Sequence, residues 1–250
     1  MEWVLFVSQL LNGLQLGVLL FLLAAGLTLV FGIMDFVNLA HGSLYMMGAY
    51  FCVTLNPLLG SFPLAVLVAV VLTFILGIAV ELVVSRHLYQ RDHLDQVLAT
   101  FGLILFFNGA VHLIWGPEGN PIALPEYLNG RFILPAGIEI PTFRVAIIAT
   151  GLAVAAGLIW LVTMTRMGML IRAGASNRRM AGALGGDIKK LFALVFALGA
   201  AMAGLAGMMI TPITEANIGM GDDILIVGMI DVMERSYLDG FMKLFLDNQS

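Results

Sequence analysis

Residues 191–212 read LFALVFALGAAMAGLAGMMITP, a run of 22 residues without a charged side chain. A helix needs about 20 mostly apolar residues to cross the hydrocarbon core of a bilayer, so this run is long enough to span a membrane. It also carries small residues four apart, Ala200/Gly204 and Ala203/Gly207, which allow helix backbones to approach closely in lipid. The stretch predicts a membrane-spanning helix packed against other helices.

The composition of the whole chain agrees with a membrane environment. Of 250 residues, 60% are hydrophobic and only 11% are charged, and the mean hydropathy is +1.00. A soluble domain carries about 25% charged residues, so we expect this chain to face lipid over most of its surface. The single cysteine, Cys52, excludes an internal disulfide and a cysteine-based metal cluster.

Five further stretches are candidates for membrane crossings. They are residues 3–33, 40–55, 62–84, 96–115 and 142–165. The first includes an amphipathic lead before about residue 11, and the second has only 16 residues, so we interpret it as a short or broken span. The predicted fold class is an all-α polytopic transmembrane helix bundle with six crossings up to Pro212, and about six to seven in the whole chain. Small pairs at Gly13/Gly17 and Ala153/Gly157 add to the evidence for a packed bundle.

The distribution of basic residues predicts the orientation. Cytoplasmic loops are enriched in Lys and Arg. If residues 85–95 and 166–190 lie on one side, together with 34–39, that side holds eight Lys and Arg, and the external connectors hold two. The external side then also carries the acids Glu118, Glu126, Glu139, Glu215, Asp222 and Asp223. We therefore expect the N-terminus outside.

The external loop 116–141 contains five prolines. Proline at this density prevents a helix, so we predict a structured loop with short β pairing around residues 131–134.

Polar residues within apolar runs are costly in lipid and mark candidate sites. Five of them are candidates for the translocation path: Asn12, Gln15, Asn38, His41 and Asn108. Hydrogen bonding between helices is the commoner role for such residues, and both interpretations stay open. Asp35 precedes the second span and is the candidate N-cap of that helix.

The chain shows no catalytic constellation and no metal or cofactor motif. Its histidines are scattered, and it has no HExxH pattern and no phosphate-binding loop. We therefore expect no catalytic residues, no metal and no bound cofactor, and ATP, if it drives the protein, binds to a partner.

The connector 166–190 carries half of all Lys and Arg in the chain, six cations against one acid, Asp187. Retention on the cytoplasmic side accounts for the charge. Its many small residues, with Met180 and Leu184 four apart, also predict a short helix that ends near Gly185 and presents a mildly apolar face among arginines. This pattern favours docking of a cytoplasmic partner over orientation alone.

Two of these stretches are specific enough to resemble a known family. Residues 32–50, GIMDFVNLAHGSLYMMGAY, resemble the opening motif of branched-chain amino acid ABC transporter permeases of the LivH type. Residues 166–185, RMGMLIRAGASNRRMAGALG, are similar to the cytoplasmic coupling loop of that family. The block 196–212, followed by Asp222 and Asp223, also fits, so the resemblance covers residues 1 to about 226.

The resemblance implies a permease subunit of an ATP-driven importer in the bacterial inner membrane. Its implied partners are a LivM-like second permease subunit, two cytoplasmic ATPase subunits that bind ATP, a periplasmic substrate-binding protein and the lipid bilayer, with no nucleic acid. The residues that would contact an ATPase subunit are Arg172, Ala173, Ala175, Arg178, Arg179, Met180, Ala181, Leu184 and Gly185. The loop 116–141 would face the binding protein.

The chain departs from the family pattern near its C-terminus. Where the family continues with a Gly-rich apolar stretch and further spans, this sequence has a polar tail, 227–250. We therefore divide the chain into a transmembrane permease domain, 1–226, and an atypical tail, and expect a few tens of residues to be missing between them.

Four other functions remain alternatives. They are a related permease for urea or short amides, a non-functional truncated permease, a secondary transporter and an intramembrane enzyme. The last two are disfavoured, because Glu81 is the only acid within the clean spans and no nucleophile and base face each other.

Overall fold

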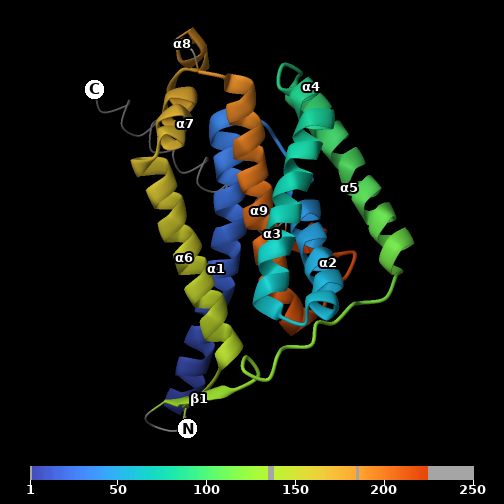
Figure 1. The fold of residues 1–250 in the computed structure, drawn as a ribbon, viewed down its shortest axis with the longest axis vertical. Coiled ribbons are helices and arrows are strands. Elements are labelled where there is room, and N and C mark those ends of the chain that lie inside the picture. Colours follow the sequence, from blue (N-terminus) through green and yellow to red (C-terminus); the bar gives the residue numbers. More distant parts are fainter. Residues whose placement is uncertain (1, 135–137, 184–185, 225–250) are drawn as a thin grey trace.

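The computed structural model describes residues 2–134, 138–183 and 186–224, and their side chains apart from those at 2–5, 132–134, 138–140 and 178–179. Within these ranges six long helices form a bundle (Figure 1): α1 (Glu2–Met34), α2 (His41–Leu59), α3 (Phe62–Val80), α5 (His93–Trp115), α6 (Thr142–Met164) and α9 (Ile188–Thr214). The predicted helical membrane bundle is confirmed, and each of the six predicted stretches forms a helix, although only five of these helices are long and apolar enough to cross a membrane. The expected discontinuity after residue 226 and the tail 227–250 lie outside the described residues.

Helix α2 differs from the other five. The other five are long and apolar enough to cross a membrane, whereas α2 does not meet this combined criterion of length and hydropathy. Residues 41–50 of α2 are all buried, and the helix packs against α3, α5 and α9. The first half of α2 is thus enclosed by protein, and α2 is a continuous helix that is longer than the 16 residues predicted. Whether it is a short or broken span stays a prediction.

The core of the bundle lies along α9, whose small residues allow α1, α2 and α3 to approach closely. A Cβ atom added to Gly48 of α2 would lie 2.4 Å from the Cα atom of Gly204, and one added to Gly26 of α1 would lie 2.8 Å from the Gly199 carbonyl oxygen. Ala200 and Ala203 are fully buried. The small pairs predicted on this helix are thus contact sites.

The small pairs on α1 and α6 are not contact sites in the described chain. A Cβ atom added to Gly13, Gly17 or Gly157 would meet no described atom within 4 Å, and Ala153 is exposed. Small residues spaced four apart are therefore contact sites on α9 but not at these positions of α1 and α6 in the described chain.

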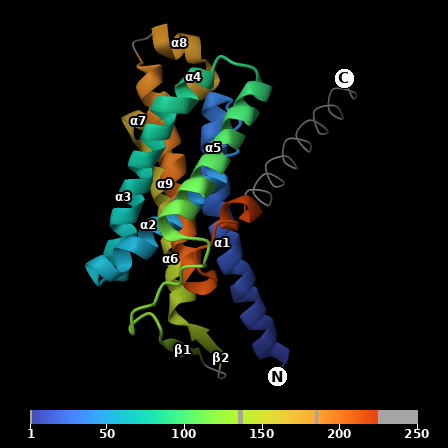
Figure 2. The same cartoon turned by 90° about the vertical axis from the view of Figure 1, so that its right-hand side faces the viewer.

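The connectors lie at two opposite ends of the bundle (Figures 1 and 2). One end, here the connector end, carries α4 (Arg86–Leu88) with the turn to α5, and also α7 (Arg166–Ser176) and α8 (Arg178–Ala183). The other, the ribbon end, carries the start of α1 and the antiparallel pair β1 (Arg131–Leu134) and β2 (Ile138–Pro141). The predicted β pairing and the common side of 85–95 and 166–190 are confirmed.

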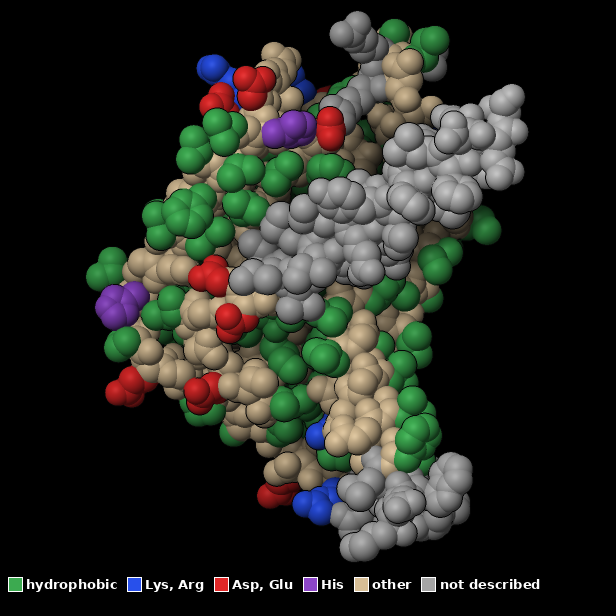
Figure 3. All heavy atoms as spheres, turned by 180° about the vertical axis from the view of Figure 1, so that it is seen from behind, with side chains coloured by type: hydrophobic (Ala, Val, Ile, Leu, Met, Phe, Trp, Pro, Cys, Tyr) green, Lys and Arg blue, Asp and Glu red, His purple; other side chains and the backbone are tan. Residues whose placement is uncertain are grey.

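The outer surface between the two ends is largely apolar. Only 11% of the most apolar stretch of α6 and 17% of that of α5 are buried. Figure 3 shows hydrophobic side chains over most of this surface and Lys and Arg toward the two ends. The arrangement suits a multi-pass membrane protein with lipid or another subunit around α5 and α6.

Candidate translocation and coupling sites

Helix α2 begins inside the bundle, far from the end of α1. After Met34 the chain leaves the helix at Asp35, whose φ is +52°, and residues 35–38 are not helical. The Nε2 atom of His41 lies 3.2 Å from the carbonyl oxygen of Leu23 in α1. Met34 follows Leu23 by eleven residues, so α2 starts about 16 Å from the connector end of α1 at about 1.5 Å per residue.

The first turn of α2 has no side-chain cap. Its N-cap is Ala40, and the N–H of Leu44 is the first to reach a helical carbonyl, that of Ala40, at 3.2 Å. The backbone N–H groups of Gly42 and Ser43 have no acceptor among the described residues. The prediction that Asp35 caps this helix is wrong, because Asp35 continues α1 through a bond to Phe31 O and its side chain is exposed.

Three side chains near this turn hold buried polar atoms that have no partner in the described chain. Asn38 is 2% exposed and neither of its amide atoms is hydrogen-bonded, and the same holds for Ser43 Oγ and His41 Nδ1. The carbonyl of Asn38 accepts the His41 N–H at 3.4 Å, so Asn38 belongs to this turn. Buried polar groups are normally paired, and such a group of unpaired ones is a candidate binding site.

A second segment approaches α2 from the ribbon end. Helix α9 ends at Thr214, and its C-cap Glu215 has φ +67°. Residues 216–224, of which 220–224 form a short helical turn, lead back toward the middle of the bundle, where Figure 2 shows the red end of the described chain. A Cβ atom on Gly221 would lie 2.5 Å from the carbonyl oxygen of Gly42. Only glycine allows this approach.

This return corrects the position expected for Asp222. The Nδ2 atom of Asn108 donates to Asp222 Oδ2 at 3.5 Å. Asn108 precedes Trp115, the last residue of α5, by seven residues, so the contact lies about 10 Å from the ribbon end of that helix. Asp222 therefore lies at membrane depth and not in an external connector.

The five predicted path residues fall into two groups. Asn38 and His41 lie together at the start of α2, and Asn108 is linked to them through Asp222 and the neighbouring Gly221. Asn12 and Gln15 lie nearer the ribbon end of α1, where Asn12 Nδ2 contacts Gln9 Oε1 at 3.5 Å. Gln15 is buried.

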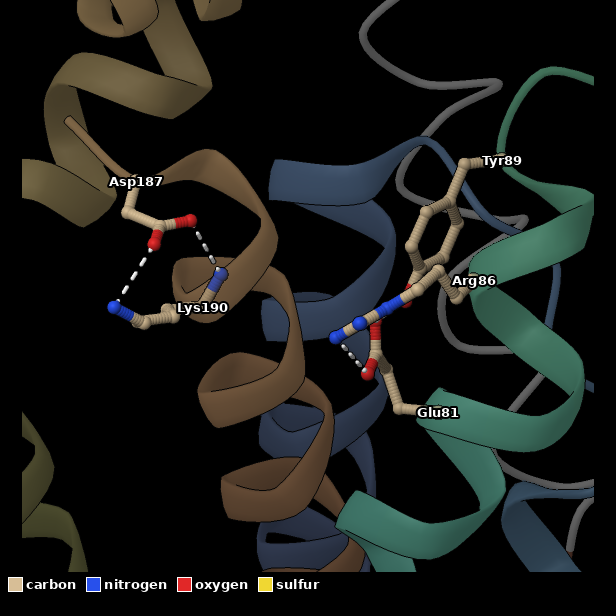
Figure 4. A network of polar contacts seen from close by, with 5 residues as sticks. All are labelled: Glu81, Arg86, Tyr89, Asp187 and Lys190. Atoms are coloured by element: carbon tan, nitrogen blue, oxygen red, sulfur yellow. Dashed lines mark hydrogen bonds and ion pairs between the residues drawn. The ribbon is translucent and has the colours of Figure 1, made fainter. Parts of the chain in front are cut away.

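At the connector end a π-helix creates a buried ion pair. Helix α3 continues into η1 (Glu81–Ser85) and α4, and the wider π turn brings residues five apart onto one face. The Glu81 carboxylate, which is fully buried, accepts hydrogen bonds from Arg86 Nη2 at 3.0 Å and Nε at 3.3 Å, and from the Tyr89 hydroxyl at 3.1 Å (Figure 4). Burial, and then the charge of Glu81, raise the pKa of Tyr89, which keeps the hydroxyl protonated as a donor.

This ion pair is connected to the segment before α2. The ring of Tyr89 packs edge-on against Phe36 at 5.7 Å and against Phe192 of α9 at 5.1 Å. Gln96 of α5, also buried, accepts the N–H of Val37 at 3.1 Å and donates to the carbonyls of Leu88 and Arg91. The segment 35–40 is thus attached to the α4–α5 turn and to α9.

The basic connector is a pair of short helices rather than the single helix predicted. Asn177 interrupts it, with extended φ and ψ, because its side-chain oxygen accepts the Met180 N–H at 3.0 Å and caps α8. Helix α7 packs on α9 at Gly174, which lies against Leu191, and Ile171 of α7 is buried. Gly168 lies so close to the carbonyl oxygens at the end of α6 that a Cβ atom has no room.

The predicted ATPase-contact residues have different environments. Ala173, Ala175 and Met180 are exposed, and Ala181 is buried. Arg172 is engaged within the chain, since its guanidinium donates to the Val162 carbonyl near the end of α6. The side chains of Arg178 and Arg179, and Leu184 and Gly185 as a whole, lie outside the described residues. The predicted apolar pair is therefore described only at Met180.

Reasoning from the sequence missed three residues of these sites: Ser43, Gln96 and Arg86. Arg86 follows Glu81 by five residues, a spacing that an α-helix places on different faces. Only a π turn pairs them, and the sequence ELVVSR carries no clear signal for one. Ser43 has a signal, because it is a polar residue in the stretch that resembles the family motif.

Comparison with known proteins adds a family match. The family model described as the permease component of branched-chain amino acid transport systems matches residues 9–231. The chain is 31% identical to the high-affinity branched-chain amino acid transport permease BraD of Pseudomonas aeruginosa over 218 residues, which is 82% of this chain and 70% of BraD. It is 31% identical to LivH of Escherichia coli K12 over 223 residues (84% and 71% of the two chains).

A more distant relative comes from an archaeon. The probable LivH permease of Methanocaldococcus jannaschii is 29% identical over 217 residues, 83% of this chain and 67% of that protein. No solved structure matches the chain.

Proposed function

The chain belongs to the family of branched-chain amino acid transport permeases, and from this premise we propose that it is the membrane-spanning subunit of an ATP-driven ABC importer for branched-chain amino acids. The observation that carries the proposal is the family match over residues 9–231, which includes both the motif at 32–50 and the connector 166–185. The chain itself is a transport component, and ATP hydrolysis belongs to its partners.

The proposed complex has four kinds of partner. A second, LivM-like permease subunit shares the membrane domain, two ATPase subunits bind at the connector end, and a periplasmic binding protein delivers the amino acid at the ribbon end. The membrane is the bacterial inner membrane, with the N-terminus outside. The excess of Lys and Arg in connectors 85–95 and 166–190, which lie at one end of the bundle, supports this orientation.

The structure of the connector suits a docking role. Helices α7 and α8 lie at the connector end with Ala173, Ala175 and Met180 exposed. Helix α7 is held to α6 by Arg172 and packs on α9 at Leu191. Since α9 contacts α1, α2 and α3, a displacement of α7 by an ATPase subunit has a direct route of packed contacts to the start of α2.

Charge reversal in α8 tests the docking role. The full transporter is purified through a tag on this chain, and the ATPase subunit that co-purifies is quantified. We expect the double variant Arg178→Glu, Arg179→Glu to reduce it at least about tenfold, the scale of an interface hot spot. Lys189→Glu, an exposed charge reversal at the same end, is the matched control. Unchanged co-purification in the double variant would contradict the docking role.

Uptake tests the substrate. Cells that express the complete transporter are expected to accumulate radiolabelled leucine in a manner that depends on the binding protein. Accumulation of urea or acetamide without leucine would redirect the substrate assignment while leaving the family membership intact.

A further inference from the structure

We propose that the first turn of α2, together with Gly221 and Asp222, forms an intramembrane site for an amino-acid zwitterion, with Gly42, Ser43 and Asn38 at its carboxylate and Asp222 at its ammonium group. The proposal rests on the proposed function, because it assigns the two charges of the transported amino acid to particular residues. Neither the family match nor the names of the relatives specify such a site.

The carboxylate part has donors without acceptors. The N–H groups of Gly42 and Ser43 are free among the described residues, and the N-terminus of a 19-residue helix carries a partial positive charge. Such helix ends bind anions readily. Discontinuous membrane helices place these ends near the middle of the bilayer, where they contact the anionic groups of substrates.

The side chains at this turn point to a ligand independently of the helix end. Ser43 and Asn38 are each 2% exposed and hold unpaired polar atoms. Cα–Cβ bonds in a helix tilt toward its N-terminus, so the Ser43 hydroxyl lies on the side of the free N–H groups. The Asn38 amide and the Ser43 hydroxyl both donate hydrogen bonds, and a carboxylate accepts them.

The part of the site that would bind the ammonium group is the acid that follows Gly221. Gly221 contacts the carbonyl of Gly42, and the next residue, Asp222, contacts Asn108 of α5. A carboxylate at membrane depth requires a counter-charge, and in the described chain Asp222 forms no ion pair. The ammonium of an amino acid supplies that charge.

The two parts complement each other. A zwitterion that leaves water requires a partner for each charge, since an unpaired charge in a low dielectric is costly. The arrangement places a positive helix end and a negative side chain on adjoining segments. Neutral solutes such as urea or acetamide carry neither charge and gain little from it.

The test uses the complete transporter in proteoliposomes, with assembly checked by co-elution of the ATPase subunits. We expect Ser43→Ala and Asp222→Asn each to reduce leucine uptake roughly tenfold, because the first removes a hydrogen bond to the substrate carboxylate and the second removes the counter-charge of the ammonium. We expect Asn38→Asp to reduce uptake further through like-charge repulsion. The matched controls are Ser61→Ala, at the uncapped start of α3, and Asp223→Asn, which is exposed. Both are expected to retain uptake.

Two half-substrates separate a binding role from a structural one. Saturation-transfer NMR on the transporter without its binding protein is recorded with 4-methylpentanoate, which has the carboxylate alone, and with leucinol, which has the ammonium alone. We expect Ser43→Ala to weaken the 4-methylpentanoate signal several-fold and to spare leucinol, and Asp222→Asn to do the reverse.

The outcomes distinguish the two proposals. Wild-type leucine uptake together with equal losses for both probes in each variant, or with no loss in either, would overturn the site and leave the proposed function standing. If Asn38→Asp fails to assemble, the crossed pattern of the other two variants still decides. A wild-type transporter that accumulates a neutral amide and no leucine would overturn both.

Discussion

Helices α6 and α9 are both uncharged over most of their length and both long enough to cross a bilayer, with α6 the more apolar of the two. Yet 83% of the most apolar stretch of α9 is buried in the bundle, against 11% for α6. Hydropathy thus indicates that a helix resides in the membrane, while the size of its residues and their contacts decide whether protein or lipid surrounds it.

The difference is largest at single glycines. Gly204 of α9 touches Gly48 of α2, whereas Gly157 of α6 faces open space in the described chain. The contact between Gly204 and Gly48 leaves no room for an added methyl group, whereas the open space beside Gly157 leaves ample room. The four predictions below test this contrast, beginning with the largest effect.

The largest effect is expected from Gly48→Ala. Its new Cβ atom would lie 2.4 Å from the Gly204 Cα atom, and overpacking of this kind costs about 3 kcal/mol, which corresponds to a loss of roughly 10 °C in Tm. Gly157→Ala, the matched control, adds the same methyl group in a helix and is expected to stabilise by about 0.5–1 kcal/mol. Thermal unfolding in detergent measures both, and effects of the same sign would remove the contrast.

A buried charge extends the contrast to polar groups. Arg86→Gln leaves the Glu81 carboxylate buried without its counter-charge, and we expect a loss of about 3 kcal/mol. Glu81→Gln leaves a guanidinium that is 34% exposed and remains partly hydrated, so about 1 kcal/mol is expected. Thermal unfolding of the two variants checks the order. A larger loss for Glu81→Gln would contradict it.

A smaller and local effect is expected in the exposed connector. Asn177→Ala removes the cap of α8 at a cost of about 1 kcal/mol, which would raise amide exchange in α8 about fivefold. Asn177→Asp retains an acceptor and is the control. Because α8 lies outside the core, global Tm is expected to stay constant, and a large fall in Tm would show that the connector stabilises the whole bundle.

The smallest effect concerns Asp187, the N-cap of α9. A hydrogen bond from the Lys190 backbone N–H lowers the pKa of Asp187 in the folded protein. A group with a lowered folded pKa stabilises the protein above its unfolded pKa, and this contribution is lost as pH falls through the folded value, below about pH 4. Asp187→Asn is expected to flatten the dependence of Tm on pH in that range. If Tm of the variant falls below about pH 4 as steeply as that of the wild type, other groups determine the dependence of Tm on pH in this range.

Much of this architecture follows from the sequence. The apolar runs predict the six helices, the charge distribution predicts which connectors share an end, and the prolines with residues 131–134 predict the ribbon. These features depend on local composition, which determines whether a segment can enter lipid and where it must stop.

The sites are harder to predict because they depend on contacts between distant segments. Asp222 reads as an external acid in the sequence, and only the contact between Gly221 and Gly42 places it at depth. The start of α2 reads as capped by Asp35, and only the left-handed turn at that residue leaves it uncapped. Asn38 and His41 were identified because polar residues in an apolar context are conspicuous.

The π turn at Glu81–Ser85 has a genetic consequence. A π turn holds one residue more than an α turn, so loss of a single codon between Glu81 and Arg86 would restore a regular helix there. The helix would stay apolar and membrane-long, and Arg86 would follow Glu81 by four residues, a spacing that a regular α-helix places on one face. Among in-frame indels of this gene, loss of one codon at residues 82–85 would therefore let the buried carboxylate keep its counter-ion. Gain of one codon there would place the two residues six apart, about 240° around a regular helix, and separate them.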